Sequence, residues 1–210
     1  METRSLELYF TEDVVRTDSM AYREKAHLLL PPHGDYNRFT AVCTQSETRF
    51  FITSSSAAGL RRMENFFLRV YRAASKQTEE PPTPVESLMV VERKRIRPPR
   101  FEYFPRLVRN ILDLTYVAGI EDLIYEVTLV SGMRLGGRIG FHYYIEVGTR
   151  DPAGLGQVAG YLKNEIREFN GGTGLRLKIR KQARFQDNLF SDPIFLMNVL
   201  RIPAERENPE

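Results

Sequence analysis

The sequence predicts an α+β protein in which two main amphipathic helices pack on a largely antiparallel, barrel-like β-sheet. Two segments, Tyr36–Thr44 and Thr48–Ser54, are rich in aromatic and β-branched residues and flank a short turn, as in a β-hairpin. Two others, residues 58–75 and 153–169, carry apolar residues at the spacing of one helix face. Strand-like and helix-like sequence patterns within one chain indicate the mixed α+β class.

Four further segments alternate apolar and polar side chains or form short apolar runs, and are expected as strands. They are residues 5–10, 88–96, 139–148 and 175–182. The stretch from Ile120 to Val127 has apolar residues at i, i+3, i+4 and i+7, which favours a short helix starting at Ile120. A strand through Tyr125–Val130 is the alternative.

Both expected helices have start signals. Ser54–Ser56 offer an N-cap to the first, and the turn that begins at Asp151 precedes the second.

The segment Thr78–Glu86 has three prolines, which cannot continue a helix, so it is expected to be a surface loop. Since neither side of this loop looks self-sufficient, we predict one domain over residues 1–184. We expect residues 185–210 to be an apolar extension with a disordered end.

Composition bounds the class of protein. The chain has 30 Lys and Arg residues against 27 Asp and Glu, and this small excess predicts no general phosphate-binding surface. Cys43 is the only cysteine, so the chain can form neither an internal disulfide nor a cysteine-based zinc cluster. No apolar run approaches the roughly 20 residues of a membrane helix, and METRSLELYF lacks the apolar core of a signal peptide. We expect an intracellular protein.

The three histidines give little support to a metal site, because they are scattered along the chain. His27 and His33 are expected in solvated loops, and His142 is expected at the start of a strand that forms part of the barrel wall. Cys43 lies in an apolar strand without a neighbouring histidine, which indicates a structural thiol. The sequence therefore names no catalytic, cofactor-binding or metal-binding residue.

One alternative chemistry is that of a metal-dependent, tunnel-type triphosphatase. Such a site needs inward carboxylates for metal and rows of Lys and Arg for phosphate. The candidates are Glu7, Glu92, Glu126, Glu146, Arg93, Lys94, Arg95, Arg176, Lys178 and Arg180. Residues two apart on a strand share a side, so a tunnel favours Glu-x-Glu pairs, and SLELYF, LIYEVTL and YYIEVGT each have one Glu. We therefore interpret Glu146 as a residue of the barrel wall. We interpret the basic side chains of LRLKIR as the solvated face of a strand, and we expect its Leu175, Leu177 and Ile179 to pack inward.

Two segments indicate binding partners. The basic and aromatic stretch VERKRIRPPRFEYF could grip phosphate and stack bases, or contact an acidic protein surface. Its candidate residues are Arg93, Arg95, Arg97, Arg100 and Tyr103. The apolar tail NLFSDPIFLMNVLRI is expected to pack on its own domain or to dock onto a partner. Its candidate contact residues are Phe190, Ile194, Phe195, Leu196, Val199 and Leu200.

Four patterns carry a family resemblance: LVRNILDL, IEDLIYEV, YYIEVGTRDPAG with the helix after it, and LRLKIR. Over roughly residues 105–180 they resemble subunit eighteen of the Mediator head module. The resemblance implies a closed antiparallel barrel that is related to tunnel triphosphatases but lacks their carboxylate rows. It also implies a protein-binding role in RNA polymerase II transcription, with head subunits twenty and eight as partners.

The chain departs from this family in two places. Only about ten residues separate Ser131 from His142, where the family has further strands, and the tail extends past the family's usual end.

We expect a non-catalytic, protein-binding subunit of a nuclear, Mediator-like assembly that needs no cofactor. The alternatives are the triphosphatase and an RNA-contacting component of a large ribonucleoprotein, in the nucleus or another intracellular compartment such as the mitochondrion.

Overall fold

The computed structural model describes residues 4–10, 24–79, 81–95, 104–133, 139–172 and 175–180. Its strands form one eight-stranded sheet in the order β4-β1-β3-β2-β6-β7-β5-β8, and all neighbours are antiparallel. The strands are β1 (Arg4–Tyr9), β2 (Tyr36–Thr44), β3 (Thr48–Ser54), β4 (Ala74–Thr78), β5 (Glu86–Arg95), β6 (Asp122–Met133), β7 (Ile139–Thr149) and β8 (Leu175–Arg180). The α+β class and the antiparallel sheet expected from the sequence are confirmed.

The helices are α2 (Ala57–Tyr71), α3 (Phe104–Leu112), α4 (Leu114–Val117) and α5 (Leu155–Gly172), with the short 3-10 turns η2 (Ala26–Leu29) and η4 (Pro152–Gly154). The two main helices expected from the sequence are α2 and α5. Both predicted caps are present, since the Ser56 hydroxyl accepts from the Gly59 amide and the Asp151 carboxylate accepts from the Ala153 amide. None of the described helices has the length and apolar character to cross a membrane.

The sheet consists of two halves with mirrored strand order. The first half is β4-β1-β3-β2, and the second is β6-β7-β5-β8, so that β2 and β6 meet in the middle. The second half follows the connectivity strand, helix, strand, strand, helix, strand. In each half a hairpin leads into the main helix, which then leads to the edge strand. Thus α2 and α5, and likewise β4 and β8, occupy corresponding places.

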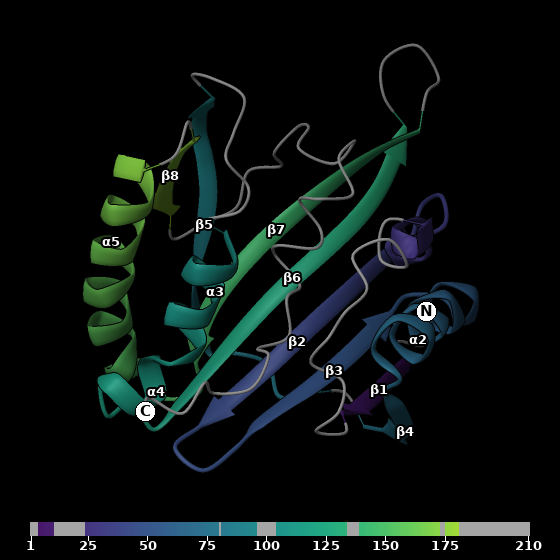
Figure 1. Cartoon of the computed structure of the whole chain (residues 1–210), viewed down its shortest axis with the longest axis horizontal. Helices are drawn as coiled ribbons and strands as arrows, with labels where there is room; N and C mark the ends of the chain where they lie inside the picture. The colour runs from purple at the N-terminus through teal and green to yellow at the C-terminus, as the bar shows by residue number, and fades with distance from the viewer. Residues whose placement is uncertain are drawn as a thin grey trace.

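The sheet is open, with β4 and β8 as its two edges. The described strands therefore do not form the closed barrel that the Mediator resemblance implies. Figure 1 shows α2 over the β1 end of the sheet and α5 at the opposite end beside β8. Helix α3 lies between α5 and the middle of the sheet.

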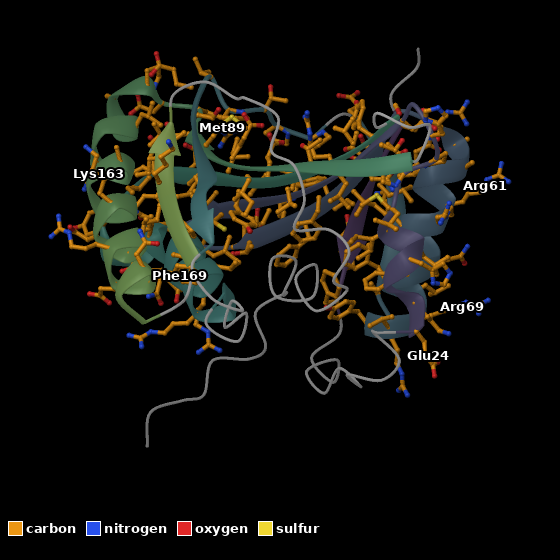
Figure 2. All side chains as sticks on the ribbon, turned by 90° about the horizontal axis from the view of Figure 1, so that it is seen from above. Glu24, Arg61, Arg69, Met89, Lys163 and Phe169 are labelled. Carbon is orange, nitrogen blue, oxygen red and sulfur yellow. The ribbon has the colours of Figure 1, made fainter. Side chains whose placement is uncertain are left out.

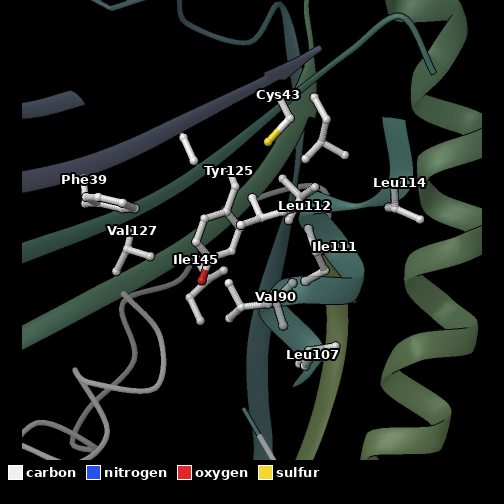
Figure 3. Packing of buried hydrophobic residues seen from close by; sticks show 14 of the residues in the cluster. Phe39, Cys43, Val90, Leu107, Ile111, Leu112, Leu114, Tyr125, Val127 and Ile145 are labelled. Carbon is white, nitrogen blue, oxygen red and sulfur yellow. The ribbon is translucent and has the colours of Figure 1, made fainter. Parts of the chain in front are cut away.

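The main core lies between the helices and one face of the sheet. Phe39 of β2 stacks on Phe67 of α2 with ring centroids 5.8 Å apart. At the other end, Tyr125 and Ile145 of the sheet point toward α3, where Ile111 is buried (Figure 3). Each such side chain contributes about 1.5–3 kcal/mol when it is fully buried, so this interface holds the helices to the sheet.

One sequence expectation is wrong: the stretch from Ile120 is not a helix but strand β6. Every residue from Asp122 to Leu129 is buried. A central strand whose two faces are both covered loses the alternation that marks a strand, and its apolar run then also fits helical spacing. The alternative strand through Tyr125–Val130 is the one that forms.

Strand β4 corrects a second expectation, which gave these residues to the end of the first helix and the following loop. Helix α2 ends at Tyr71, because Arg72 has the left-handed backbone angle φ 50°. The next residues pair with β1 through their backbones, from Ser5 opposite Thr78 to Tyr9 opposite Ala74. Four of the five side chains of β4 are exposed, so no apolar pattern marks this strand.

Candidate functional site

Ion pairs of buried carboxylates lie on the sheet face that points away from the helices, here called the helix-free face. Paired residues of an antiparallel ladder point to the same face, which makes it possible to follow rows across the sheet. One row of the helix-free face contains Lys76, Glu7, Phe51, Thr40, Glu126, Glu146 and Met89. The adjacent row on the helix side is apolar from β1 to β5, with Leu8, Phe50, Ala41, Tyr125, Val147 and Leu88.

A bidentate ion pair joins β1 to β3 on this face. Arg49 Nε donates to Glu7 Oε1 at 2.7 Å, and Arg49 Nη2 donates to Glu7 Oε2 at 2.9 Å. The hydrogen bonds from Arg49 hold the pKa of the Glu7 carboxyl below its ordinary value, against the opposing effect of burial. Because Glu7 is 8% exposed, its charge depends on this partner.

A second network joins β2 to β6 in the middle of the sheet. Glu126 is 3% exposed and accepts a hydrogen bond from Thr40 Oγ1 at 3.1 Å. Arg38 Nη1 lies 3.7 Å from Glu126 Oε1, and Arg38 Nε donates to Thr128 Oγ1 at 3.1 Å. The buried carboxylate therefore has both a hydroxyl donor and a counter-charge.

Glu146 lies directly across from Glu126 on the adjacent strand β7. It is half-buried, and the Ser87 hydroxyl donates to its Oε1 at 3.2 Å. The register thus brings together two of the carboxylates that the sequence singled out. Glu7 lies in the same row but three strands from Glu126, roughly 14 Å at the usual strand spacing, which is too far to share one ion.

A third ion pair lies at the end of β6. The Asp122 carboxylate is buried and accepts from the backbone amide and the Nε of Arg150. Beside it is an open cavity of about 320 Å³, lined in part by Asp151 and Gln157. Asp151 caps η4, and Gln157 Nε2 donates to the Ala118 carbonyl at 2.7 Å, so both side chains already have partners.

The helix-free face also has a small apolar cluster formed by Val42, Phe51 and Ile124. The Arg49 guanidinium lies over the Phe51 ring, 5.1 Å from its centroid. The same arginine that neutralises Glu7 therefore covers an apolar side chain, as long charged residues commonly do.

Nucleophilic chemistry has little support at Cys43. This thiol is fully buried in β2, and burial raises its pKa to about 12. A thiol with such a pKa is protonated at neutral pH and is a poor nucleophile. Among the described residues, no group of three His, Cys, Asp or Glu side chains is placed to hold a metal ion.

The expected orientation of the β8 side chains is confirmed where side chains are described. Leu177 is buried, and Ile179 packs against the main core. Lys178, between them, points to the helix-free face. His27 and His33 are both exposed, as expected, but His27 lies in the 3-10 turn η2 and not in a loop.

The two predicted partner-binding segments are placed only in part. Arg93 and Arg95 belong to the end of β5, whose last residue pairs with Leu175 of β8. The remaining candidates lie outside the described residues: Arg97, Arg100, Tyr103, Phe190, Ile194, Phe195, Leu196, Val199 and Leu200. Both binding expectations therefore stay predictions.

Comparison with known proteins leaves the family open. No family model and no curated protein matches the chain. The solved structures that are similar to it include the following two. A glycopeptide hexose oxidase complexed with teicoplanin is 9% identical, with 81% of this chain and 41% of the oxidase covered and a TM-score of 0.38. A putative monooxygenase from Fusobacterium nucleatum subsp. nucleatum is 12% identical, with 89% and 98% covered and a TM-score of 0.28. Scores this low support no conclusion about function.

Sequence reasoning missed the side chains that donate to the buried carboxylates. Glu7 and Arg49 are 42 positions apart, and Thr40 and Glu126 are 86 apart. Strand alternation signals which face each residue occupies, but only the strand order reveals which charges meet.

Proposed function

We propose that this chain is a non-catalytic, protein-binding subunit of a multiprotein transcription assembly of the Mediator type, in the nucleus. By the resemblance of residues 105–180, its partners are other subunits of a Mediator head module. The proposal needs no cofactor.

The observation that carries the proposal is the pairing of charges across the helix-free face. Glu7, Glu126 and Asp122 each have an arginine partner and lie on strands that are fixed by the sheet. The carboxylates are buried, and the side chains of their partners Arg38, Arg49 and Arg150 are 25%, 43% and 53% exposed, so the sheet presents positive groups at fixed positions on this face. Such a pattern suits the electrostatic complementarity by which protein surfaces select a partner.

The test is native affinity purification of the tagged chain from its own cells at moderate salt, followed by mass spectrometry. We expect RNA polymerase II and Mediator subunits in the eluate. A purification of an unrelated α+β protein with the same tag serves as the control. Recovery of the tagged chain alone, as a monomer, would overturn the proposal.

The tunnel-type triphosphatase remains the second candidate, because the register places Glu146 opposite Glu126. A metal that used this pair would have to compete with Arg38 and Thr40 for the Glu126 carboxylate. For this reason we favour the protein-binding proposal.

Phosphate release from a nucleoside triphosphate with manganese or magnesium separates the two candidates. We expect no metal-dependent release. Release that Glu146→Gln abolishes, while the exposed control Glu121→Gln leaves it unchanged, would make the triphosphatase the better proposal.

A further inference from the structure

The outer face of helix α2 has a charge pattern that the fold does not explain. The helix and its C-cap carry four arginines, Arg61, Arg62, Arg69 and Arg72, and one glutamate, Glu64. Arg62 donates to the His27 carbonyl at 2.9 Å, and Glu64 accepts from the Ser75 hydroxyl. Within the described part of the chain, no hydrogen bond or ion pair engages the side chains of the other three arginines.

These three arginines surround an exposed leucine. Leu68 is 52% exposed, although most large apolar residues of α2 are buried against the sheet. Positions 61, 68 and 72 differ by seven and four residues, so they lie along one line of the helix, which spans roughly 16 Å. Figure 2 shows Arg61 and Arg69 directed away from the body of the protein.

Helix α5 gives an internal comparison, because it occupies the corresponding place in the second half of the sheet. Its Lys163 and Arg167 are balanced by Glu165 and Glu168. Lys163 also points away from the body of the protein (Figure 2). A helix in this place therefore needs no excess of positive charge in order to pack.

The composition of the surface favours a protein partner over a nucleic acid. Single-stranded nucleic acid is held by aromatic side chains that stack on bases together with basic groups. Phe66, Phe67 and Tyr71 of α2 are all buried, so the helix offers no exposed ring of its own. The helix instead offers the aliphatic side chain of Leu68 with arginines around it. This arrangement fits an acidic segment that carries an apolar residue.

We infer that the outer face of α2, formed by Arg61, Leu68, Arg69 and Arg72, binds an acidic amphipathic segment of a partner protein. Carboxylates of this segment pair with the three arginines, and one of its apolar side chains packs on Leu68. The arginines steer and orient the partner, while the burial of Leu68 contributes affinity. The inference deepens the proposed protein-binding function and rests on it for the biological partner.

The experiment measures the fluorescence anisotropy of three labelled probes with the purified full chain. The probes are an amphipathic peptide of glutamate and leucine, the same peptide with lysine in place of glutamate, and a single-stranded RNA. We expect the glutamate peptide alone to bind, with an affinity that falls as salt rises. Arg61→Glu with Arg69→Glu should weaken binding at least about tenfold, whereas the matched α5 control, Lys163→Glu with Arg167→Glu, should not.

Leu68→Ser tests the apolar contact separately. It should weaken peptide binding without changing its salt dependence, and Tyr161→Ser on α5, also exposed, is its control. All substituted positions are exposed, and thermal denaturation confirms that each variant is folded.

Three results would overturn the inference: binding of the lysine peptide with equal affinity, binding of RNA that depends on the same arginines, or no effect of the α2 reversal. The outcome is independent of the native purification. If the purification recovers polymerase and Mediator subunits but the peptide does not bind, the α2 binding surface is overturned and the assembly proposal stays intact. If the peptide binds but the chain purifies alone, the assembly proposal is overturned and the α2 binding surface stays intact.

Discussion

Arg49 on β3 holds Glu7 on β1 through two parallel hydrogen bonds, and the same guanidinium covers the ring of Phe51. One side chain thus links charge neutralisation to packing on the helix-free face. The pair joins two strands of the first half of the sheet, and its loss should be measurable in both stability and pH dependence.

Arg49→Met should destabilise the protein by about 1–3 kcal/mol at pH 7, because the buried Glu7 would lose its charged hydrogen-bond donor. The measurement is urea unfolding. Arg69→Met, at an exposed position of α2, is the control and should change stability by less than about 0.5 kcal/mol.

The same pair predicts a dependence on pH. The folded-state pKa of Glu7 lies below the ordinary value of 4.5, so the stabilisation is complete above pH 4.5 and is lost as pH falls through the folded-state pKa. The stability difference between the wild-type chain and Arg49→Met should therefore shrink in acid. A difference that stays constant down to pH 2 would contradict the assigned role of Arg49.

Gly59→Ala should destabilise the protein although alanine favours a helix. A Cβ at Gly59 would lie 2.3 Å from Ser54 Oγ and 2.7 Å from Asn37 Oδ1, and we expect a loss of about 1–3 kcal/mol from the forced shift. Gly160→Ala on α5 is the matched control, because its Cβ would meet no atom within 4 Å. It should stabilise by up to about 1 kcal/mol. Urea unfolding of both variants checks the opposite signs.

Thr40→Val should cost about 1–3 kcal/mol, because it removes the hydroxyl donor to the buried Glu126 carboxylate. Valine keeps the β-branched shape, so packing changes little. Thr78→Val on the edge strand β4 is the control and should be nearly neutral. Equal effects of the two substitutions in a thermal melt would show that the Glu126 network contributes no stability.

Cys43 should resist thiol reagents in the folded protein. Its burial removes access, and the raised pKa of about 12 leaves almost no thiolate at pH 8. Alkylation followed by mass spectrometry should show slow labelling in buffer and complete labelling in guanidinium chloride. Rapid labelling of the folded chain would contradict the burial of β2.

The elements with strong local signals were predictable from the sequence. The hairpin Tyr36–Thr44 and Thr48–Ser54 forms with these same bounds. Helix α2 begins after its predicted Ser56 cap, and Asp151 caps the turn η4 that leads into α5. Glu146 was correctly placed on a strand. Its position opposite Glu126 was not foreseen, because Glu126 fell in a stretch interpreted first as a helix.

The errors have a common cause. Strand β6 lost its alternation because it lies at the centre of the sheet with both faces buried, and β4 has no apolar pattern because it is a polar edge strand. Each strand pairs with a strand from a distant part of the chain, β6 with β2 and β4 with β1. Local side-chain patterns do not record such pairing.

Local sequence patterns were sufficient to predict the α+β class, the hairpin, the two main helices and the outward basic residue of β8. Periodicity and capping depend on neighbours within a few residues, so a single chain segment carries them. Packing between distant segments sets the pairing of β2 with β6 and the contact of Arg49 with Glu7. It also leaves Leu68 of α2 exposed beside arginines whose side chains have no partner among the described residues. These features depend on strand order and on which faces remain uncovered, and both are set by packing between segments far apart in the chain.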